Sequence, residues 1–178
     1  MTEKEKAALG LLYNSNFDAE LRAERIACQC KCHAYNQLSP DDRDARAQLL
    51  RQIIPALGED ALIEQPFHCD LGYQIKTGHH FYANYNLVIL DEAPVCIGDF
   101  VFLGPDCGIY TASHPVNAQQ RNEGLEYAHP VTIGSHVWLG GGVRILPGVR
   151  IGSNVIIGSG SVVTRDIPDG VIAAGNPC

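Results

Sequence analysis

The sequence predicts a mainly β protein: a solenoid of very short parallel strands preceded by an N-terminal α-helical segment. Three observations support this prediction. Aliphatic residues recur every six positions after residue 60, helical patterns are confined to the residues before it, and most of the 18 glycines follow Gly72, where tight corners need them. Residues 1–58 are expected to form the helical segment that packs on the solenoid, and residues 59–178 the solenoid itself.

Three helices are expected in the N-terminal segment. Thr2 followed by Glu5 is a capping-box pattern, which predicts a short helix that ends near Gly10. Asp18 is suited to cap a second helix. The expected apolar stripe of that second helix consists of Ala23, Ile26, Ala27, Cys30 and Ala34.

The third helix is expected to begin at Ser39 as its N-cap, with Pro40 as its first residue. Asp41 and Asp42 then place negative charge in the first turn, where the helix dipole favours it. The expected apolar stripe consists of Ala45, Leu49, Leu50 and Ile53, and Pro55 and Gly58 end the helix.

The six-residue period is the main signal after residue 60. Nine units in one frame begin with an aliphatic residue: Ile97, Leu103, Ile109, Ile133, Leu139, Ile145, Ile151, Ile157 and Val163. A small or β-branched residue follows four positions later in most units: Val101, Cys107, Val137, Val143, Val149, Val155 and Ser161. Ile75, Phe81 and Leu87 form an earlier run in a shifted frame.

A period of six matches neither an α-helix nor a simple alternating strand. It suits one short flat strand plus a corner, so that three units close a triangular coil and coils stack at about 4.8 Å. A β-sandwich is the alternative, but its turns recur every 8–12 residues or so rather than at a fixed six.

The longest interruption of the period is an extended loop expected at residues 111–130. Insertions in repeat proteins lie on the binding face, so this loop is the expected place for chemistry. It contains His114, Glu126 and His129. A histidine is suited to be a general base near neutral pH, although the residues alone leave a surface or capping role equally open for His114.

Composition argues against several classes of protein. Lys+Arg is 13 and Asp+Glu is 20, giving a net charge of −7, which is unlike a nucleic-acid binder. No stretch reaches the roughly 18 consecutive apolar residues of a membrane span, and the N-terminus lacks the apolar core of a signal peptide. These features predict a cytoplasmic protein.

The seven cysteines form an odd set without the paired spacing of a zinc site. This pattern favours reduced thiols. Cys28, Cys30 and Cys32 form a C-x-C-x-C run, for which a metal site is open but buried small apolar side chains are the favoured interpretation.

Several motifs are specific to one group of proteins. A helical segment ending in AYN is followed by FYANYN, TASHPV, PVTIGSHVWLGGGVRILPGV and SVVTRDIPDGVIAAGNPC. From about Glu3 to Cys178 the sequence thus resembles the hexapeptide-repeat acyltransferases, and among them the maltose and galactoside O-acetyltransferases with their nodulation-acetyltransferase relatives. The resemblance implies a left-handed parallel β-helix. It also implies transfer of an acetyl group from acetyl-CoA to a hydroxyl of a maltose-, glucose- or galactoside-like sugar in a ternary complex, with no metal required.

The resemblance implies roles for individual residues. His114 matches the catalytic base and Asn84 the group that stabilises the transition state. The implied substrate-binding residues are Asp70, Tyr82, Asp91, Glu92, Glu126 and Asp18. The implied CoA-binding residues are Gly141, Ser159, Thr164 and Arg165. Three alternatives stay open: Asn84 as an amide of the strand ladder, Glu126 as the group that orients His114, and Asp18 as a helix cap.

The resemblance also implies a homotrimer with sites between subunits, and we expect Trp138 near a subunit contact. Two other classes of function are considered. One is a zinc enzyme like the γ-class carbonic anhydrases, which needs three histidines that converge from neighbouring strands. The histidines considered for it are His79, His80, His114, His129 and His136. The other is a non-catalytic trimeric scaffold.

Overall fold

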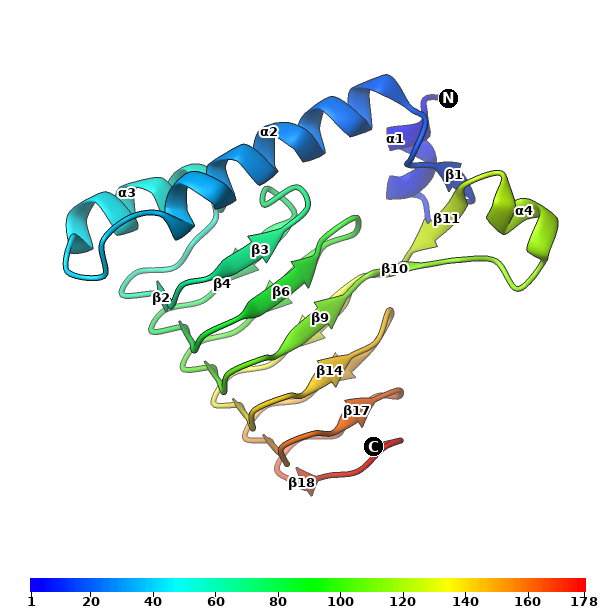
Figure 1. Cartoon of the computed structure of the whole chain (residues 1–178). Helices are drawn as coiled ribbons and strands as arrows, with labels where there is room; N and C mark the ends of the chain where they lie inside the picture. The colour runs from blue at the N-terminus through cyan, green and yellow to red at the C-terminus, as the bar shows by residue number, and fades with distance from the viewer.

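The computed structural model describes residues 1–178 and shows a triangular prism of stacked coils with helices across one end (Figure 1). Each coil contributes one short strand to each of three parallel sheets. Sheet 1 contains β4 (Ile75–Thr77), β7 (Val95–Ile97), β12 (Val131–Ile133) and β15 (Arg150–Ile151). Sheet 2 contains β2 (Leu62–Ile63), β5 (Tyr82–Ala83), β8 (Phe102–Leu103), β13 (Trp138–Leu139), β16 (Ile156–Ile157) and β18 (Ile172–Ala173). Sheet 3 contains β3 (Phe67–Cys69), β6 (Leu87–Leu90), β9 (Gly108–Tyr110), β14 (Arg144–Ile145) and β17 (Val162–Val163).

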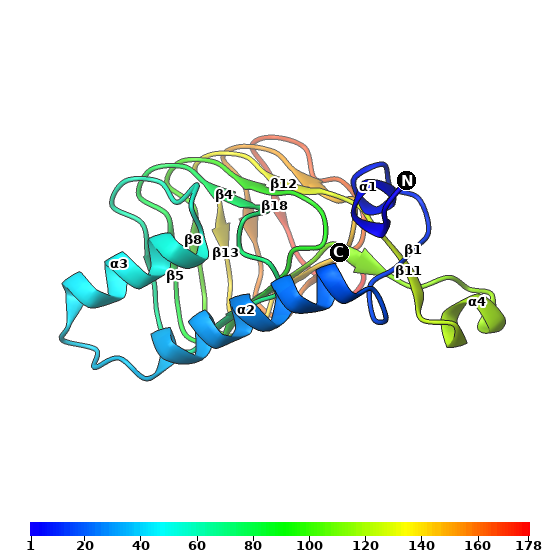
Figure 2. The same cartoon turned by 90° about the horizontal axis from the view of Figure 1, so that it is seen from above.

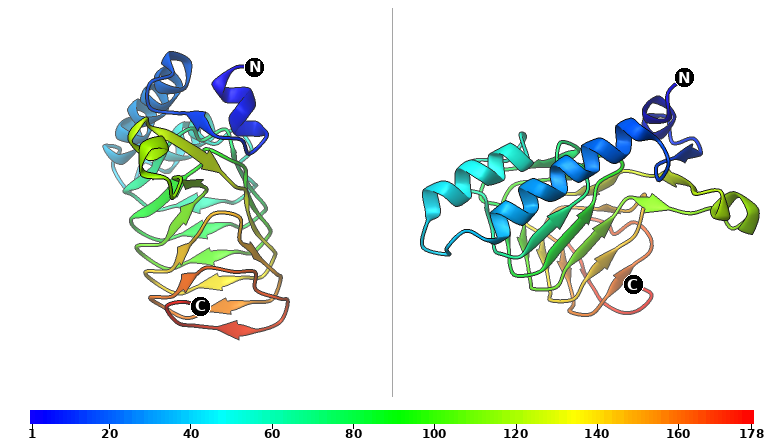
Figure 3. Two further views of the ribbon diagram at one scale, coloured as in Figure 1. Left: turned by 90° about the vertical axis from the view of Figure 1, so that its right-hand side faces the viewer. Right: turned by 45° about the horizontal axis from the view of Figure 1, so that its top comes forward.

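The predicted six-residue pattern forms the interior of the prism. All nine unit-starting aliphatic residues and all seven residues four positions after them are buried. All of them except the polar Ser161 belong to one hydrophobic core of 34 residues that runs through the stack. The predicted left-handed parallel β-helix is therefore confirmed, as is the helical segment before it. Figure 3 shows the stacked coils from two further directions.

The shifted frame of the early repeats has a simple structural cause. Ile75 pairs with Val95, twenty residues later, whereas Ile133 pairs with Ile151, eighteen residues later. The two additional residues lie in the corner between β6 and β7, residues 91–94. Extra length at a corner leaves the strands in register, so it changes the frame of the sequence without disturbing the stack.

Two edges of the prism flank sheet 3. The corners from sheet 2 to sheet 3 form the "glycine edge", residues 84–86, 104–106, 140–142 and 158–160. The corners from sheet 3 to sheet 1 form the "arm edge", residues 70–74, 91–94, 111–130, 146–149 and 164–166. Coils approach closely along the glycine edge: a Cβ on Gly104 would lie 2.5 Å from the backbone nitrogen of Gly141.

Helices α1 (Glu3–Ala8) and α2 (Ala19–Asn36) agree with the predicted boundaries within a few residues. Thr2 forms the predicted capping box and Asp18 caps α2. Figure 2 shows α2 lying across the end of the prism. No helix is both long and apolar enough to span a membrane.

The predicted apolar stripe of α2 is wrong, because all five of its residues are exposed. The buried face instead carries Leu21, Cys28, Cys32 and Tyr35. Both sets are compatible with a helical repeat, and packing selects the face with the larger Leu and Tyr side chains. The Tyr35 hydroxyl donates a hydrogen bond to the carbonyl oxygen of Ile63, which ties α2 to the first coil.

The third helix, α3 (Arg43–Ile53), begins later than predicted. Its N-cap is Asp42, whose side chain accepts a hydrogen bond from the Ala45 N–H, while residues 39–41 precede the helix. Leu50 and Ile53 are buried as predicted, whereas Ala45 and Leu49 are only partly buried. Ser39 and Pro40 resemble a helix start, but Asp42 provides an equally good cap three residues later.

The expected loop at residues 111–130 is a structured arm. It consists of β10 (Ala112–Ser113), α4 (Ala118–Asn122) and β11 (Leu125–Ala128), and β10 and β11 pair antiparallel. Strand β1 (Tyr13–Asn14) pairs antiparallel with the other side of β11. The N-terminal segment therefore holds the arm through strand pairing. The arm projects beyond the coils (Figure 1).

Candidate active site

Ten of the twelve implied site residues lie on the two edges that flank sheet 3, whereas Tyr82 lies on sheet 2 and Asp18 precedes α2. Asn84, Gly141 and Ser159 lie on the glycine edge. Asp70, Asp91, Glu92, His114, Glu126, Thr164 and Arg165 lie on the arm edge. Strand β6 spans the sheet between Asn84 and Asp91, a separation of roughly 20 Å for an extended chain. One chain therefore does not bring the implied base and Asn84 together.

His114 follows β10 on the arm, and its side chain is exposed. Its Nδ1 lies 3.4 Å from the carbonyl oxygen of Leu125 on the neighbouring strand β11. Because a carbonyl only accepts, this contact favours the tautomer with the proton on Nδ1. The Nε2 lone pair is then available to take a proton.

Glu126 is buried where β11 meets the N-terminal strand. Its Oε1 accepts a hydrogen bond from the Tyr13 hydroxyl at 2.6 Å. Burial raises the pKa of Tyr13, and the hydrogen bond to Glu126 raises it further. The side chain of Glu126 is thus joined to Tyr13, and the contact to the His114 ring comes instead from the Leu125 carbonyl.

Asp91 organises the corner that carries Asp70. It is fully buried, and its two oxygens accept hydrogen bonds from the backbone N–H groups of Asp70, Leu71 and Gly72 at 2.6–2.9 Å. Burial raises the pKa of Asp91 to about 6, although the three N–H groups act in the opposite direction. The oxygens implied for substrate binding are therefore already engaged with the backbone, and the side chain positions Asp70.

Glu92 lies among other carboxylates. Burial is the main cause that raises its pKa to about 9, and Asp70 and Glu126 add to it. A neutral Glu92 at pH 7 is suited to donate a hydrogen bond to an acceptor such as the Asp70 carboxylate. Its Oε2 is buried without a hydrogen-bond partner.

The variant Glu92→Gln tests this protonation state. Since the folded-state pKa is raised to about 9 from about 4.5, Glu92 favours folding at low pH and this contribution is lost as pH rises from about 4.5 through 9. Thermal unfolding is measured at pH 5, 7 and 9. As the pH rises, the Tm of the wild type should fall by several degrees more than the Tm of Glu92→Gln. The exposed Glu123→Gln is the control and should follow the wild type. Parallel curves for wild type and Glu92→Gln would show that Glu92 is ionised in the folded protein.

Arg25 is a residue of this region that the sequence analysis missed. It lies on α2 and lines a cavity of about 120 Å³ together with Tyr13 and Glu92. One of its terminal nitrogens donates a hydrogen bond to Ser15 Oγ at 3.0 Å, whereas its Nε is buried without a partner. An arginine on an amphipathic helix carries no signal of such a position. Arg25 and Glu92 thus both line the cavity, and each has one buried polar atom without a hydrogen-bond partner.

Asn84 immediately follows β5. Its contacts are compatible with both roles considered for it, an amide of the strand ladder and a donor that stabilises the transition state. Its backbone N–H donates to the Leu103 carbonyl at 3.0 Å, as a ladder amide does. Its side-chain Oδ1 accepts from the Tyr85 N–H at 2.8 Å, which leaves the Nδ2 protons free to donate elsewhere. Tyr82, two residues earlier, lies half-buried on sheet 2 beside Phe102.

The implied CoA-binding residues are divided between the edges. Gly141 is half-buried and Ser159 exposed on the glycine edge, where the Gly160 N–H donates to the Gly141 carbonyl. Small side chains there leave backbone accessible to an extended ligand. Thr164 and Arg165 are exposed on the arm edge.

Asp18 caps α2, since its Oδ1 accepts from the Leu21 N–H at 2.9 Å. The alternative role as a helix cap is thus observed. The histidines considered for zinc form no group of three within the chain; His80 and His136 instead stack on the two faces of Phe100.

The chain matches two protein-family models. Residues 6–58 match the maltose acetyltransferase hexapeptide capping motif, and residues 130–165 match the bacterial transferase hexapeptide with six repeats. The chain is 47% identical to nodulation protein L of Rhizobium meliloti over 99% of this chain and 96% of that protein.

Solved structures are similar over the whole chain. A maltose O-acetyltransferase from Clostridium difficile 630 is 48% identical with a TM-score of 0.97, covering 100% of this chain and 95% of that one. A galactoside acetyltransferase in complex with coenzyme A is 38% identical with a TM-score of 0.96, covering 100% of this chain and 88% of that one. With its prism, arm and helical cap, the chain belongs to the hexapeptide-repeat acetyltransferases of the maltose and galactoside O-acetyltransferase family.

Proposed function

We propose that the protein transfers an acetyl group from acetyl-CoA to a hydroxyl of a sugar by direct attack in a ternary complex. The observation that carries this proposal is the exposed His114 on an arm paired with β1; its Nδ1 contact to the Leu125 carbonyl favours the tautomer with a free lone pair on Nε2. Similarity to a maltose O-acetyltransferase and to a galactoside acetyltransferase supports the choice of acceptor.

His114 is the general base of the proposed reaction. Its Nε2 takes the proton of the acceptor hydroxyl while the hydroxyl oxygen bonds to the thioester carbonyl carbon. When the tetrahedral intermediate collapses, the carbon–sulfur bond breaks and His114 returns the proton to the leaving sulfur. The products are the acetyl ester and free CoA thiol, and His114 is regenerated in its starting state.

Asn84 is the proposed donor to the oxyanion that forms on the thioester oxygen. The Tyr85 N–H holds its Oδ1, so the amide group is oriented before the reaction begins. A donor that is already oriented stabilises charge at the moment it develops, without reorganisation.

The acceptor sugar is proposed to bind at the arm edge beside Asp70 and Glu92. Carboxylates accept hydrogen bonds from sugar hydroxyls, and a neutral Glu92 also donates one. A polyhydroxy compound matches such a mixed set, because every hydroxyl both donates and accepts.

A complete site is proposed to form between two copies in a homotrimer. Asn84 and the arm lie on opposite sides of sheet 3, so the glycine edge of one copy has to meet the arm edge of the next. A head-to-tail contact of this kind closes into a ring. The ring provides one site at each of its contacts.

The outward faces of the prism support this arrangement. The outward side chains of sheet 2 are Leu62, Tyr82, Phe102, Trp138, Ile156 and Ile172. Five of these are more than a third exposed, including Trp138 at 54%. Sheet 1 instead presents Lys76, Cys96, Thr132 and Arg150. A continuous apolar face on one side and a polar face on another is typical of a subunit that buries the first.

Acetyl-CoA is proposed to lie along the glycine edge, with Arg165 of a neighbouring copy near a phosphate. Reversing this charge by Arg165→Glu should raise the KM for acetyl-CoA about ten-fold or more, because a charge-assisted hydrogen bond is lost and a repulsion is added. The value of kcat should change little. Arg150→Glu makes the same charge change on the exposed face of sheet 1 and is the control. An unchanged KM in Arg165→Glu would remove Arg165 from the CoA site.

The proposed function is tested by release of free CoA thiol from acetyl-CoA in the presence of a panel of acceptors. The panel includes maltose, glucose, galactosides, an oligosaccharide and a non-sugar alcohol. We expect thiol release that depends on a sugar and saturates with it. Release at the same slow rate with every acceptor and with none would contradict the proposal.

A further inference from the structure

Three buried cysteine side chains meet between α2 and sheet 3, next to Asp70 but outside the residues assigned to the proposed reaction. Cys28 and Cys32 are one helical turn apart on the buried face of α2, and Cys69 ends strand β3 beneath them. The sulfur of Cys69 lies 3.6 Å from that of Cys28 and 3.8 Å from that of Cys32. All three sulfurs lie within 4.8 Å of one another, and no disulfide joins them.

The two separations from the Cys69 sulfur match the spacing that a tetrahedral zinc ion imposes on its ligands. With zinc–sulfur bonds of about 2.3 Å, two sulfurs at the tetrahedral angle lie about 3.8 Å apart. A disulfide would require the sulfurs at about 2.05 Å. The sulfurs converge from two elements that are far apart in the sequence, so the fold rather than local spacing creates the group.

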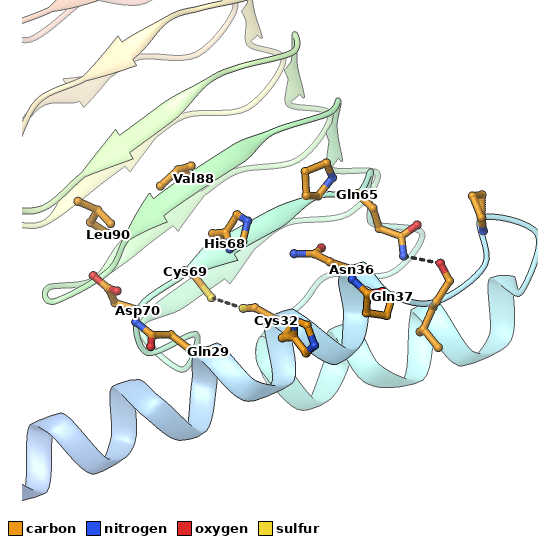
Figure 4. Close-up of a pocket in the computed structure, with 14 residues that line it drawn as sticks. Gln29, Cys32, Asn36, Gln37, Gln65, His68, Cys69, Asp70, Val88 and Leu90 are labelled. Carbon is orange, nitrogen blue, oxygen red and sulfur yellow. Dashed lines mark hydrogen bonds between the residues drawn. The ribbon is translucent and has the colours of Figure 1, made fainter.

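The group is also open on one side. Cys32 and Cys69 line a groove of about 890 Å³ between α2 and the outer face of sheet 3. His68 and Asp70 line the same groove, and Figure 4 shows Cys32 and Cys69 facing each other at its wall. The groove provides an entry path for an ion and room for a water molecule as its fourth ligand.

We propose that Cys28, Cys32 and Cys69 bind one zinc ion as thiolates, with water from the groove in the fourth position. Each thiol gives its proton to solvent as the ion binds, so three thiolates balance the two positive charges with one negative charge remaining. The ion would join α2 to the first full coil. Because the ligands come together only in the folded chain, its binding stabilises the packing of the helical cap on the prism.

The first experiment uses the reduced wild-type protein with zinc chloride alone. After removal of free metal we expect about one zinc per chain and, at saturating zinc, a Tm higher by about 5–10 °C. Substitution by cobalt should produce the intense sulfur-to-cobalt absorption of thiolate ligands. The matched variants are Cys32→Ala, which should lose the zinc, and Cys30→Ala on the exposed face of α2, which should keep it.

A second measurement on the wild type requires no variant to fold. In urea just below the unfolding transition, where local opening exposes buried thiols of the zinc-free protein, alkylation followed by mass spectrometry should show zinc protecting Cys28, Cys32 and Cys69, while the exposed Cys30 and Cys96 react with or without zinc. The proposal is overturned by zinc content below one-tenth of an ion per chain, by equal zinc in wild type and Cys32→Ala, or by an unchanged alkylation pattern.

Discussion

Replacing His114 by alanine is expected to lower kcat for acetyl transfer by about 10²–10⁴-fold. This loss corresponds to a rise in the activation free energy of about 3–5 kcal/mol. The reason is that the acceptor hydroxyl has to lose its proton as it attacks, and Nε2 of His114 is the group that the Leu125 contact leaves ready to accept it. The KM for acetyl-CoA should change little. Steady-state kinetics with the best sugar acceptor measures both constants.

The control for this prediction is His129→Ala. His129 is an exposed histidine at the base of the same arm, and its ring packs against that of Tyr127. It should keep most of the activity. Because His114 is itself exposed and outside both buried clusters, His114→Ala should unfold at the wild-type Tm. If His114→Ala retains most of its turnover, another group is the base and the proposed mechanism is wrong.

Replacing Asn84 by alanine is expected to lower kcat by about 10²–10³-fold, the usual effect of removing one oxyanion donor. The effect falls on kcat because the donated hydrogen bond strengthens only as charge develops on the thioester oxygen. The KM for the sugar should be close to that of the wild type. The measurement is again steady-state kinetics, with the Tm recorded in parallel.

Asn84→Asp separates the catalytic from the structural role of this side chain. Aspartate keeps an oxygen that accepts from the Tyr85 N–H, so the corner is preserved, but it replaces the amide donor by a carboxylate oxygen. It should therefore lose as much activity as Asn84→Ala while keeping the wild-type Tm. Full activity in Asn84→Asp would show that Asn84 acts only through the strand ladder.

The coil could be predicted from the sequence because each repeat is local. A residue such as Ile145 points inward because of its place in a six-residue unit, and the same unit recurs often enough to exclude other periods. The shifted frame was visible in Ile75, Phe81 and Leu87. Its cause, two extra residues at the arm edge, required the pairing of Ile75 with Val95.

What the sequence did not predict depends on contacts between distant segments. The buried face of α2 is selected by packing against the first coil, so Tyr35 is buried while Ile26 is exposed. The pairing of β1 with β11 joins residues more than a hundred positions apart, and no local pattern indicates it. Arg25 and the three converging cysteines were missed as groups for the same reason.

Mixing the two inactive variants tests most directly whether the site is built from two copies. His114→Ala and Asn84→Ala proteins are expressed together, or unfolded and refolded as an equal mixture, and assayed for acetyl transfer. In randomly mixed trimers about one quarter of the contacts pair an intact His114 of one copy with an intact Asn84 of the next. We therefore expect about one quarter of the wild-type activity. Activity no greater than the average of the two separate variants would contradict a shared site, because it would mean that both residues act within one chain.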